Sequence, residues 1–280
     1  MAFISKTNSG LKFPIFYPDE SIDYALRYEP KNTDIFVITY PKCGTQWCRQ
    51  IVSLIVNNGV RYANDRLLDV LEYSGQEYRY DNLVIDRLTT STVVSTHLPI
   101  QLLPYTCGSD TKYICVLRNP KDVVVAYYHQ LCDQCMFAGT VHEFVDLWLD
   151  GRAPYGDYFE YCRLYWQQQY VWPTNMLCLI YEHMTYNLRP YIMKIAELLG
   201  DSYVNRLTTS EPALIDTIIE KSTTGYIRHT LSGMRLRKSI VGHWRTHLNQ
   251  TDSYAIDKKV DEVWTGTGLE RLWEREMKFL

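Results

Sequence analysis

The sequence lacks a long apolar segment and an excess of charge of either sign. Residues 1–10 hold no apolar core long enough for a signal peptide, and apolar runs such as 123–126 (VVVA) fall far short of a membrane span. The 280 residues carry a formal net charge of −3, which argues against a general nucleic-acid-binding or anionic-membrane surface. We therefore expect a soluble cytoplasmic protein without a nucleic-acid or membrane partner, in which any anion site is a local cluster.

The sequence is also poor in metal-binding patterns. Its eight cysteines accompany no secretory signal, so we expect reduced thiols. Cys132 and Cys135 form one C-x-x-C, but a zinc site needs two more ligands, and a thioredoxin-like pair opens a helix after a strand. His243 and His247 are spaced as in a zinc protease, yet no glutamate follows His243. We expect no metal site.

Residues 40–47 (YPKCGTQW) lie where a predicted strand turns into a predicted helix. The β-branched and aromatic residues 34–40 predict a buried strand, and apolar residues at helical spacing after it predict a helix that ends near Gly59. A helix N-terminus presents backbone N–H groups and partial positive charge, to which Lys42 adds a full charge. The segment predicts an anion-binding loop, with an ordinary tight turn as the alternative for the loop alone.

This loop differs from the usual nucleoside-triphosphate loop, G-x-x-x-x-G-K-[ST], in which the lysine follows the second glycine. Here Lys42 precedes Gly44, and no glycine stands at the motif's first position. The sequence also lacks a clear acidic strand for magnesium. A small-molecule kinase is therefore a disfavoured alternative.

Strand-like and helix-like segments alternate along the chain, with no repeat or linker to divide it. Strands are predicted at 34–40, 92–95, 113–117 and 176–181, and helices at 122–132, 142–149, 157–169, 190–199 and, as a charged amphipathic segment, 270–280. Short apolar strands that alternate with helices predict an α/β fold with a mostly parallel central sheet covered by helices on both faces. We expect one domain, residues 1–280.

Polar residues follow four of the predicted strands. They are 42–45 (KCGT), 96–97 (TH), 118–122 (RNPKD) and 181–183 (YEH). Ligands of such folds bind beyond the carboxyl ends of the strands. Lysine, arginine and a helix N-terminus suit a polyanion, and His97 suits proton abstraction. Each group alone has a structural explanation, such as an ion pair between Arg118 and Asp122, but their gathering at one sheet edge predicts a functional site.

Four blocks resemble the cytosolic sulfotransferase family, whose donor is 3′-phosphoadenosine 5′-phosphosulfate. Residues 40–47 resemble its 5′-phosphosulfate loop (Y-P-K-S-G-T-T-W), 96–104 its catalytic-histidine segment, 113–129 (YICVLRNPKDVVVAYYH) its 3′-phosphate segment, and 237–245 (RKSIVGHWR) its late R-K-G-x-x-G-D-W-K segment. The blocks follow the family's order, and 16–18 (FYP) and 155–156 (YG) also fit. The resemblance implies the family's P-loop-like α/β fold.

The resemblance further implies in-line transfer of a sulfuryl group from this donor to a hydroxyl or amine, leaving adenosine 3′,5′-bisphosphate. His97 would be the general base, and Lys42 would stabilise charge on the oxygen between sulfur and phosphorus as that bond breaks. The donor-binding residues would be Lys42, Cys43, Gly44, Thr45, Gln46 and Trp47 at the 5′-phosphate, with Trp47 also on adenine, Arg118, Arg237, Lys238 and Ser239 at the 3′-phosphate, and Tyr181 and Ser222 at the base or its phosphate. No metal is implied, because cationic side chains take the part of magnesium.

Several positions depart from the family's pattern. They are Cys43 for serine, Ser95 for the lysine two residues before the histidine, Ala126 for a serine at the 3′-phosphate, Ser239 and His243 for glycine and aspartate in the late motif, and Thr224 near the position where an aromatic side chain would stack on adenine. Each hydrogen bond lost to a charged group costs about 1.5–3 kcal/mol. We expect weaker donor binding, and a non-catalytic nucleotide-binding relative remains an alternative.

The family's acceptor pocket implies a small-molecule acceptor held by aromatic and apolar side chains around His97. The candidate wall residues are Phe16, Pro41, Tyr128, Phe137 and Tyr155, for each of which ordinary core packing is the alternative. Asp133 would face the pocket and favour a protonated amine, with an ordinary solvated carboxylate as the alternative, and a phenolic or catechol-type acceptor is expected. The K-x-x-x-T-V-x-x-x-E segment through which many relatives dimerise is not matched at 245–254, which leaves monomer or homodimer open.

Overall fold

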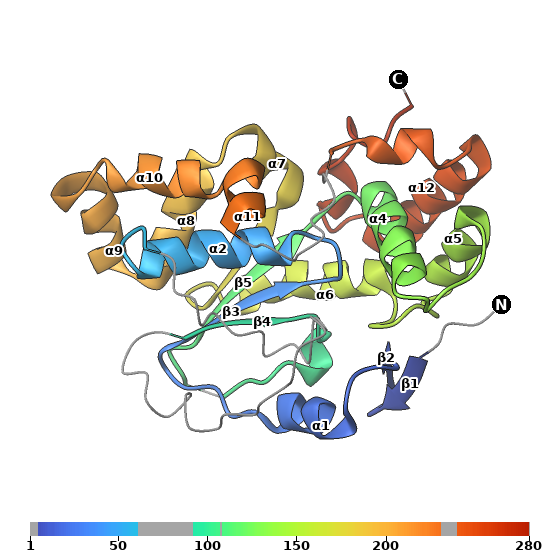
Figure 1. Cartoon of the computed structure of the whole chain (residues 1–280), viewed down its shortest axis with the longest axis horizontal. Coiled ribbons are helices and arrows are strands. Elements are labelled where there is room, and N and C mark those ends of the chain that lie inside the picture. The colour runs from blue at the N-terminus through green and yellow to red at the C-terminus, as the bar shows by residue number, and fades with distance from the viewer. Residues whose placement is uncertain (1–4, 61–91, 107, 231–239, 280) are drawn as a thin grey trace.

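A parallel sheet lies at the centre of the protein (Figure 1). The structure is a computed structural model, and it describes residues 5–60, 92–106, 108–230 and 240–279. Within these residues the sheet has four strands in the order β4-β3-β5-β6. The strands are β3 (Asp34–Thr39), β4 (Thr92–Thr96), β5 (Lys112–Leu117) and β6 (Met176–Ile180). The expected α/β architecture is confirmed.

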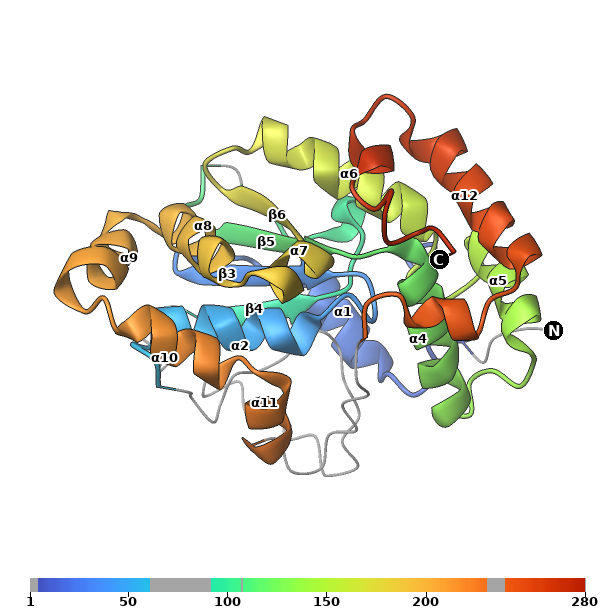
Figure 2. The same ribbon diagram turned by 90° about the horizontal axis from the view of Figure 1, so that it is seen from above.

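Helices cover both faces of the sheet (Figure 2). Alternate residues of β3 point to opposite faces, as the two-residue period of a strand requires. Ile35 and Val37 pack with α2 (Thr45–Val56), α8 (Arg189–Leu199) and α10 (Leu214–Lys221), whereas Phe36 and Ile38 pack with α1 (Asp19–Arg27), α4 (Pro120–Asp133) and α6 (Tyr158–Val171). This double burial explains the uninterrupted apolar run of the strand.

The remaining elements surround this core. They are the antiparallel hairpin of β1 (Ser5–Asn8) and β2 (Leu11–Pro14), the helices α5 (Val141–Leu149), α7 (Tyr181–Tyr186), α9 (Asp201–Asn205), α11 (Thr224–Thr230) and α12 (Gln250–Trp264), a π-helical turn (Arg206–Ser210), and 3₁₀ turns at Ile100–Leu102, His243–Thr246 and Leu269–Arg271. α12 packs on α4, α5 and α6 (Figure 1). None of the helices within the described ranges has the length and apolar character needed to traverse a bilayer.

The predicted amphipathic helix at 270–280 is wrong. A 3₁₀ turn at Leu269–Arg271 is followed by further turns through residue 277. Side chains from other segments donate hydrogen bonds to backbone carbonyls of the C-terminal segment. Trp244 Nε1 donates to Glu276 O at 2.9 Å and Lys121 Nζ donates to Met277 O at 2.6 Å. These tertiary hydrogen bonds outweigh the helical propensity of the segment.

Candidate active site

The loop between β3 and α2 carries two residues in the left-handed backbone region. Lys42 has φ +72° and Gly44 has φ +94°. A Cβ atom on Gly44 would lie 2.8 Å from a ring carbon of Tyr181, so only glycine fits there. The first hydrogen bond of α2 joins Cys48 N–H to Gly44 O at 2.9 Å, so the backbone N–H groups ahead of Cys48 form the helix N-terminus. The loop has the geometry expected of an anion-binding segment.

Tyr181 connects the predicted donor-binding residues. Its ring lies against Gly44, meets Trp47 edge-on with ring centroids 5.3 Å apart, and receives the Arg118 guanidinium 4.6 Å above its centroid. Trp47 Nε1 in turn donates to Ser222 O at 2.9 Å. The structure therefore brings together five predicted residues from four separate segments.

Arg118 links the end of β5 to the loop. Its side chain is buried, and Nη1 donates to Lys42 O at 2.7 Å. Within the part of the chain that is described, Arg118 Nε and Ser222 Oγ are buried without a hydrogen-bond partner. A buried donor left unsatisfied costs about 1–3 kcal/mol, so such groups call for an explanation. Both belong to the predicted donor site, and a polar or anionic ligand would satisfy them.

A buried carboxylate stands beside this arginine. Glu182 accepts hydrogen bonds from Asn119 N–H at 3.0 Å and from Trp273 Nε1 at 2.6 Å. Burial raises the pKa of Glu182 to about 7, although the Asn119 N–H and the charge of Arg118 act in the opposite direction. Sequence reasoning placed Glu182 at the correct strand end without giving it a role.

His97, the predicted base, is held by the strand next to it. Its Nδ1 lies 2.6 Å from the backbone oxygen of Thr39 and 3.2 Å from Thr39 Oγ1, which also lies 2.6 Å from Thr45 Oγ1. A carbonyl oxygen can only accept, so Nδ1 carries the proton and the neutral ring keeps its lone pair on Nε2. Sequence reasoning missed Thr39; its signal was a polar residue closing a buried strand.

Tyr155 is the predicted acceptor-wall residue that packs on His97. The two ring centroids are 5.2 Å apart, and Tyr155 has φ +69°, an uncommon value for a non-glycine residue. A hydrogen bond of 2.9 Å from Tyr155 N–H to Lys12 O and an edge contact with Phe13 hold it there. The structure thus places an aromatic side wall beside the predicted base.

The other predicted acceptor-wall residues differ in their contacts and in their burial. Tyr128 forms a second aromatic group with Phe137, 6.1 Å away between centroids, and donates to Gly139 O at 3.0 Å. Pro41 is buried and Phe16 is half-buried. Asp133 is exposed in the last turn of α4.

The late segment docks on the first turn of α4. Gly242 N–H and Trp244 N–H donate to the two carboxylate oxygens of Asp122 at 2.7 and 3.1 Å. Burial raises the pKa of Asp122, and the charge of Arg118 counteracts that effect. Residues 237–239, with the predicted ligands Arg237, Lys238 and Ser239, lie outside the described residues. The described part of this motif is nevertheless fastened to Asp122, four residues after Arg118.

Lys121 follows a strand end, but its side chain binds other segments of the chain and has a structural role. Its Nζ contacts Ser253 Oγ at 2.6 Å, Asp257 Oδ1 at 2.7 Å and Met277 O at 2.6 Å, all in the C-terminal part of the chain. The side chain is fully buried, and burial lowers its pKa. Lys121 thus fastens α12 and the C-terminal segment to α4.

Comparison with known proteins decides the family. Residues 32–268 match the family model described as Sulfotransferase domain. The chain belongs to this family. This sulfotransferase is 31% identical to Sulfotransferase 1B1 of Mus musculus, over 85% of this chain and 84% of that one, and 29% identical to the Amine sulfotransferase of Oryctolagus cuniculus, over 88% and 86%. It is therefore a transferase.

Solved structures share the fold. Mouse sulfotransferase SULT7A1 complexed with PAP superposes with a TM-score of 0.76 at 21% identity, covering 96% of both chains. Retinol dehydratase in complex with androsterone and inactive cofactor PAP gives 0.75 at 19% identity, covering 95% of this chain and 92% of that one. At these sequence identities the likeness to the two solved structures shows a shared fold and no more.

Three departures from the family's pattern are buried or half-buried, whereas Thr224 and His243 are exposed. Cys43 is fully buried, and burial raises the pKa of its thiol to about 12, so it is no nucleophile. Ser95 is buried too, and its Oγ has no hydrogen-bond partner among the described residues. Ala126 is half-buried on α4, one turn after Asp122.

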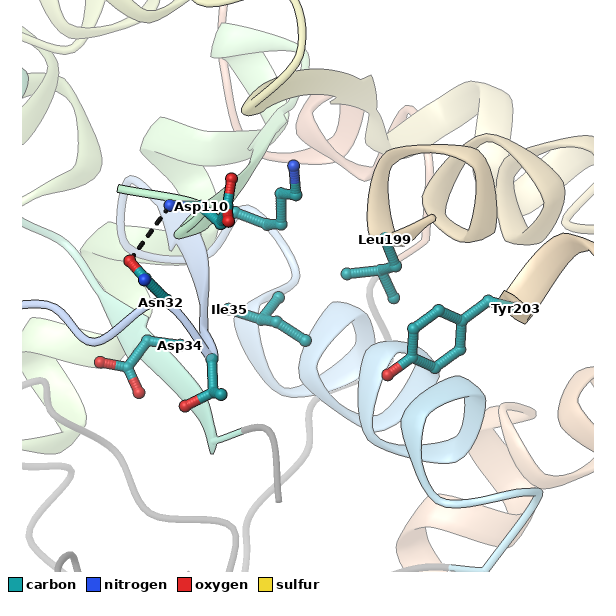
Figure 3. Close-up of a pocket in the computed structure, with 8 residues that line it drawn as sticks. Asn32, Asp34, Ile35, Asp110, Leu199 and Tyr203 are labelled. Atoms are coloured by element: carbon teal, nitrogen blue, oxygen red, sulfur yellow. Dashed lines mark hydrogen bonds between the residues drawn. The ribbon is translucent and has the colours of Figure 1, made fainter. Parts of the chain in front are cut away.

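A cavity of about 320 Å³ lies elsewhere in the sulfotransferase (Figure 3). Ile35, Leu199 and Tyr203 form its apolar side, and Asp110 N–H donates to Asn32 Oδ1 at 3.3 Å on its polar side. It opens at the amino end of β3, whereas the candidate active site follows the carboxyl end of the same strand. The two are separate features.

Proposed function

We propose that this sulfotransferase transfers the sulfuryl group of 3′-phosphoadenosine 5′-phosphosulfate to a hydroxyl or amine of a small molecule, with residues 1–280 acting as one domain. The observation that carries the proposal is the contact group of Gly44, Trp47, Arg118 and Tyr181 at the carboxyl ends of the strands. The PAP named with two solved structures of this fold belongs to the same nucleotide class.

In this proposal the α2 terminus and its loop, Lys42 through Trp47, hold the 5′-phosphosulfate. Arg118 holds the 3′-phosphate together with Arg237, Lys238 and Ser239, while Tyr181 and Ser222 contact the base or its phosphate. The unsatisfied Arg118 Nε and Ser222 Oγ support this assignment, because the donor supplies the hydrogen-bond partners that these buried atoms lack in the described residues.

The reaction is an in-line displacement at sulfur. The acceptor oxygen or nitrogen forms a bond to sulfur, its proton passes to Nε2 of His97, and the bond from sulfur to the phosphate oxygen breaks. Lys42 stabilises the negative charge that collects on that oxygen. The hydrogen bond from His97 Nδ1 to Thr39 O supports the role of the ring, since it leaves Nε2 with the lone pair that a base needs.

The acceptor we propose is a small phenolic or catechol-type molecule bound beside His97. Tyr155 supports this, because its aromatic ring packs beside the base, with 5.2 Å between the two ring centroids. Phe16, Pro41 and Tyr128 complete the proposed wall, and Asp133 is the proposed partner of an acceptor ammonium group. Two similar proteins are likewise named with small molecules: the Amine sulfotransferase, and retinol dehydratase in complex with androsterone.

The test is transfer of radiolabelled sulfate from the donor to a panel of phenols, catecholamines, steroids and alcohols, with His97→Ala as the comparison. We expect labelled product from the native protein and its collapse in the variant. PAP-dependent thermal stabilisation with no transfer to any panel member would favour a nucleotide binder, or an enzyme whose acceptor is missing from the panel. Magnesium-dependent turnover of ATP in place of the sulfate donor would favour a kinase.

A further inference from the structure

α4 ends in a turn that contains both cysteines of the C-x-x-C. Met136 N–H donates to Leu131 O at 2.8 Å and Cys135 N–H donates to Cys132 O at 3.0 Å, the paired hydrogen bonds of a Schellman motif. Cys135 occupies the position after the C-cap, with φ +56°. Glycine is usual there, because a side chain is disfavoured in the left-handed region. A cysteine in this position points to a use for its thiol.

The same turn brings the two cysteines within reach of each other. A four-residue turn closed by the Cys135 N–H to Cys132 O hydrogen bond keeps its end Cα atoms less than about 7 Å apart. Disulfides span Cα separations of about 4.4–6.8 Å. Cys135 is exposed and Cys132 half-buried, so the pair is open to a solvent oxidant at one end and shielded at the other.

The other described cysteines contrast with this pair. Cys43, Cys48, Cys115 and Cys162 are buried, and burial raises the pKa of each thiol, to about 12 for Cys43 and Cys48. Cys178 is half-buried, its Sγ lies 3.3 Å from Tyr165 O, and the thiol beside it, that of Cys115 on the neighbouring strand, is fully buried. Oxidation selects accessible thiolates that have a resolving thiol beside them. Within the described residues that selection favours the turn after α4.

We propose that Cys132 and Cys135 form a reversible disulfide when the protein meets hydrogen peroxide. The Cys135 thiolate attacks the peroxide, the O–O bond breaks, and a sulfenic acid and one water result. The Cys132 thiolate then attacks that sulfur, the S–O bond breaks, and a second water leaves. Two thiols lose two hydrogens, and one peroxide is reduced to two waters. A cellular dithiol or glutathione restores the thiols by exchange.

The disulfide acts on the segment that follows the turn. Met136 and Phe137 are buried directly after it, and Phe137 packs on Tyr128 and Phe144 at centroid distances of 6.1 and 5.3 Å. Closing the bond shifts and stiffens this segment. If Tyr128 lines the acceptor pocket, which rests on the proposed function, oxidation raises the acceptor KM severalfold and leaves PAP binding unchanged.

The experiment is peptide mapping of the full-length protein under non-reducing conditions after peroxide treatment. We expect the peptide with both cysteines to lose two hydrogens and to regain them with dithiothreitol. Cys178→Ser, the matched control, behaves like the native protein, whereas Cys132→Ser and Cys135→Gly lack the modification. Cys135→Gly retains the fold, because glycine accepts the positive φ freely.

Two results would overturn the proposal. One is oxidation of Cys135 to a sulfinic acid or a mixed disulfide while Cys132 stays a thiol. The other is a disulfide that joins either cysteine to a different partner. Because mapping needs neither donor nor acceptor, it stands apart from the proposed sulfuryl transfer. An intact disulfide with an unchanged acceptor KM would remove the regulatory consequence and leave the modification site.

Discussion

Arg118 Nη1 donates a hydrogen bond of 2.7 Å to the backbone oxygen of Lys42. The two residues follow neighbouring parallel strands, β5 and β3, and the positive φ of Lys42 belongs to the loop that this bond holds. The proposed leaving-group residue and the proposed 3′-phosphate residue are therefore parts of one unit. A change at either is expected to disturb the other.

Arg118→Ala tests this unit. It removes the bond to Lys42 O, the contact with Tyr181 and the proposed 3′-phosphate partner, so we expect PAP affinity to fall roughly ten- to a hundred-fold, the worth of a lost charged hydrogen bond. Isothermal titration with PAP measures it. Arg163→Ala, which breaks a partly exposed pair with Glu160 on α6, is the control and should leave affinity unchanged. Equal affinities of both variants would contradict the assignment.

His97→Gln and Thr39→Val separate the base from its support. His97→Gln removes the proton acceptor, and a general base is worth about 10²–10⁴ in kcat. Thr39→Val deletes the hydroxyl but keeps the backbone oxygen that orients Nδ1, so we expect less than about a tenfold loss, in keeping with one neutral hydrogen bond. Steady-state kcat at saturating donor distinguishes them. A Thr39→Val loss as large as that of His97→Gln would contradict the orientation through the carbonyl.

Glu182 predicts a pH dependence of stability. Its pKa is about 7 in the folded protein against the ordinary 4.5, so between these values the native state binds more protons than the unfolded chain. The free energy of unfolding therefore falls as pH rises from about 4.5 to 7, by up to about 3 kcal/mol from this group. Urea unfolding across that range should show a shallower fall in Glu182→Gln. The exposed Glu197→Gln should follow the native curve, and coincidence of all three curves would refute the prediction.

Gly44→Ala combines backbone strain with a clash. The φ of +94° disfavours any side chain by about 1–2 kcal/mol, and the new Cβ would sit 2.8 Å from Tyr181. Gly10→Ala supplies the matched control, because Gly10 has φ +78° and a Cβ added there would meet nothing within 4 Å. We expect Gly44→Ala to lose more stability in thermal unfolding than Gly10→Ala and to lose PAP affinity as well. Equal losses would deny the close approach of Tyr181.

Asp133→Ala tests the amine acceptor. An exposed carboxylate contributes little to stability, so the variant should unfold like the native protein. If Asp133 pairs with the acceptor ammonium, KM should rise for a catecholamine and stay constant for an uncharged phenol. Asp146→Ala, exposed on α5, is the control. Unchanged catecholamine turnover in Asp133→Ala would remove the residue from the acceptor site.

Local patterns in the sequence predict much of this fold. The β-branched run of β3 and the apolar spacing of α2 predict these two elements without knowledge of the rest of the fold, because each pattern reflects the burial of the element itself. The gathering of Gly44, Arg118 and Tyr181 also followed from sequence, since the carboxyl ends of parallel strands share one edge.

What sequence could not supply are contacts made by backbone atoms of distant segments. The polar side chain of Thr39 marks the end of its strand but does not reveal that its carbonyl orients His97, and Asp122 accepts hydrogen bonds from the N–H groups of Gly242 and Trp244. The helix predicted for the C-terminal segment was wrong for the same reason, because backbone carbonyls of this segment accept hydrogen bonds from Lys121 and Trp244. Such contacts arise from tertiary packing and leave no periodic pattern.

The attachment of Gly242 to Asp122 also sets an order of events during synthesis. The two residues are 120 positions apart, which at roughly 5–20 residues per second corresponds to about 6–24 s of translation. Until Gly242 emerges from the ribosome, the Asp122 carboxylate has water in place of its two backbone partners, and burying it would be costly. The first turn of α4 therefore reaches its final packing well after β5 has been made, and a nascent chain halted before residue 242 would hold the strands without a finished donor site of the kind proposed above.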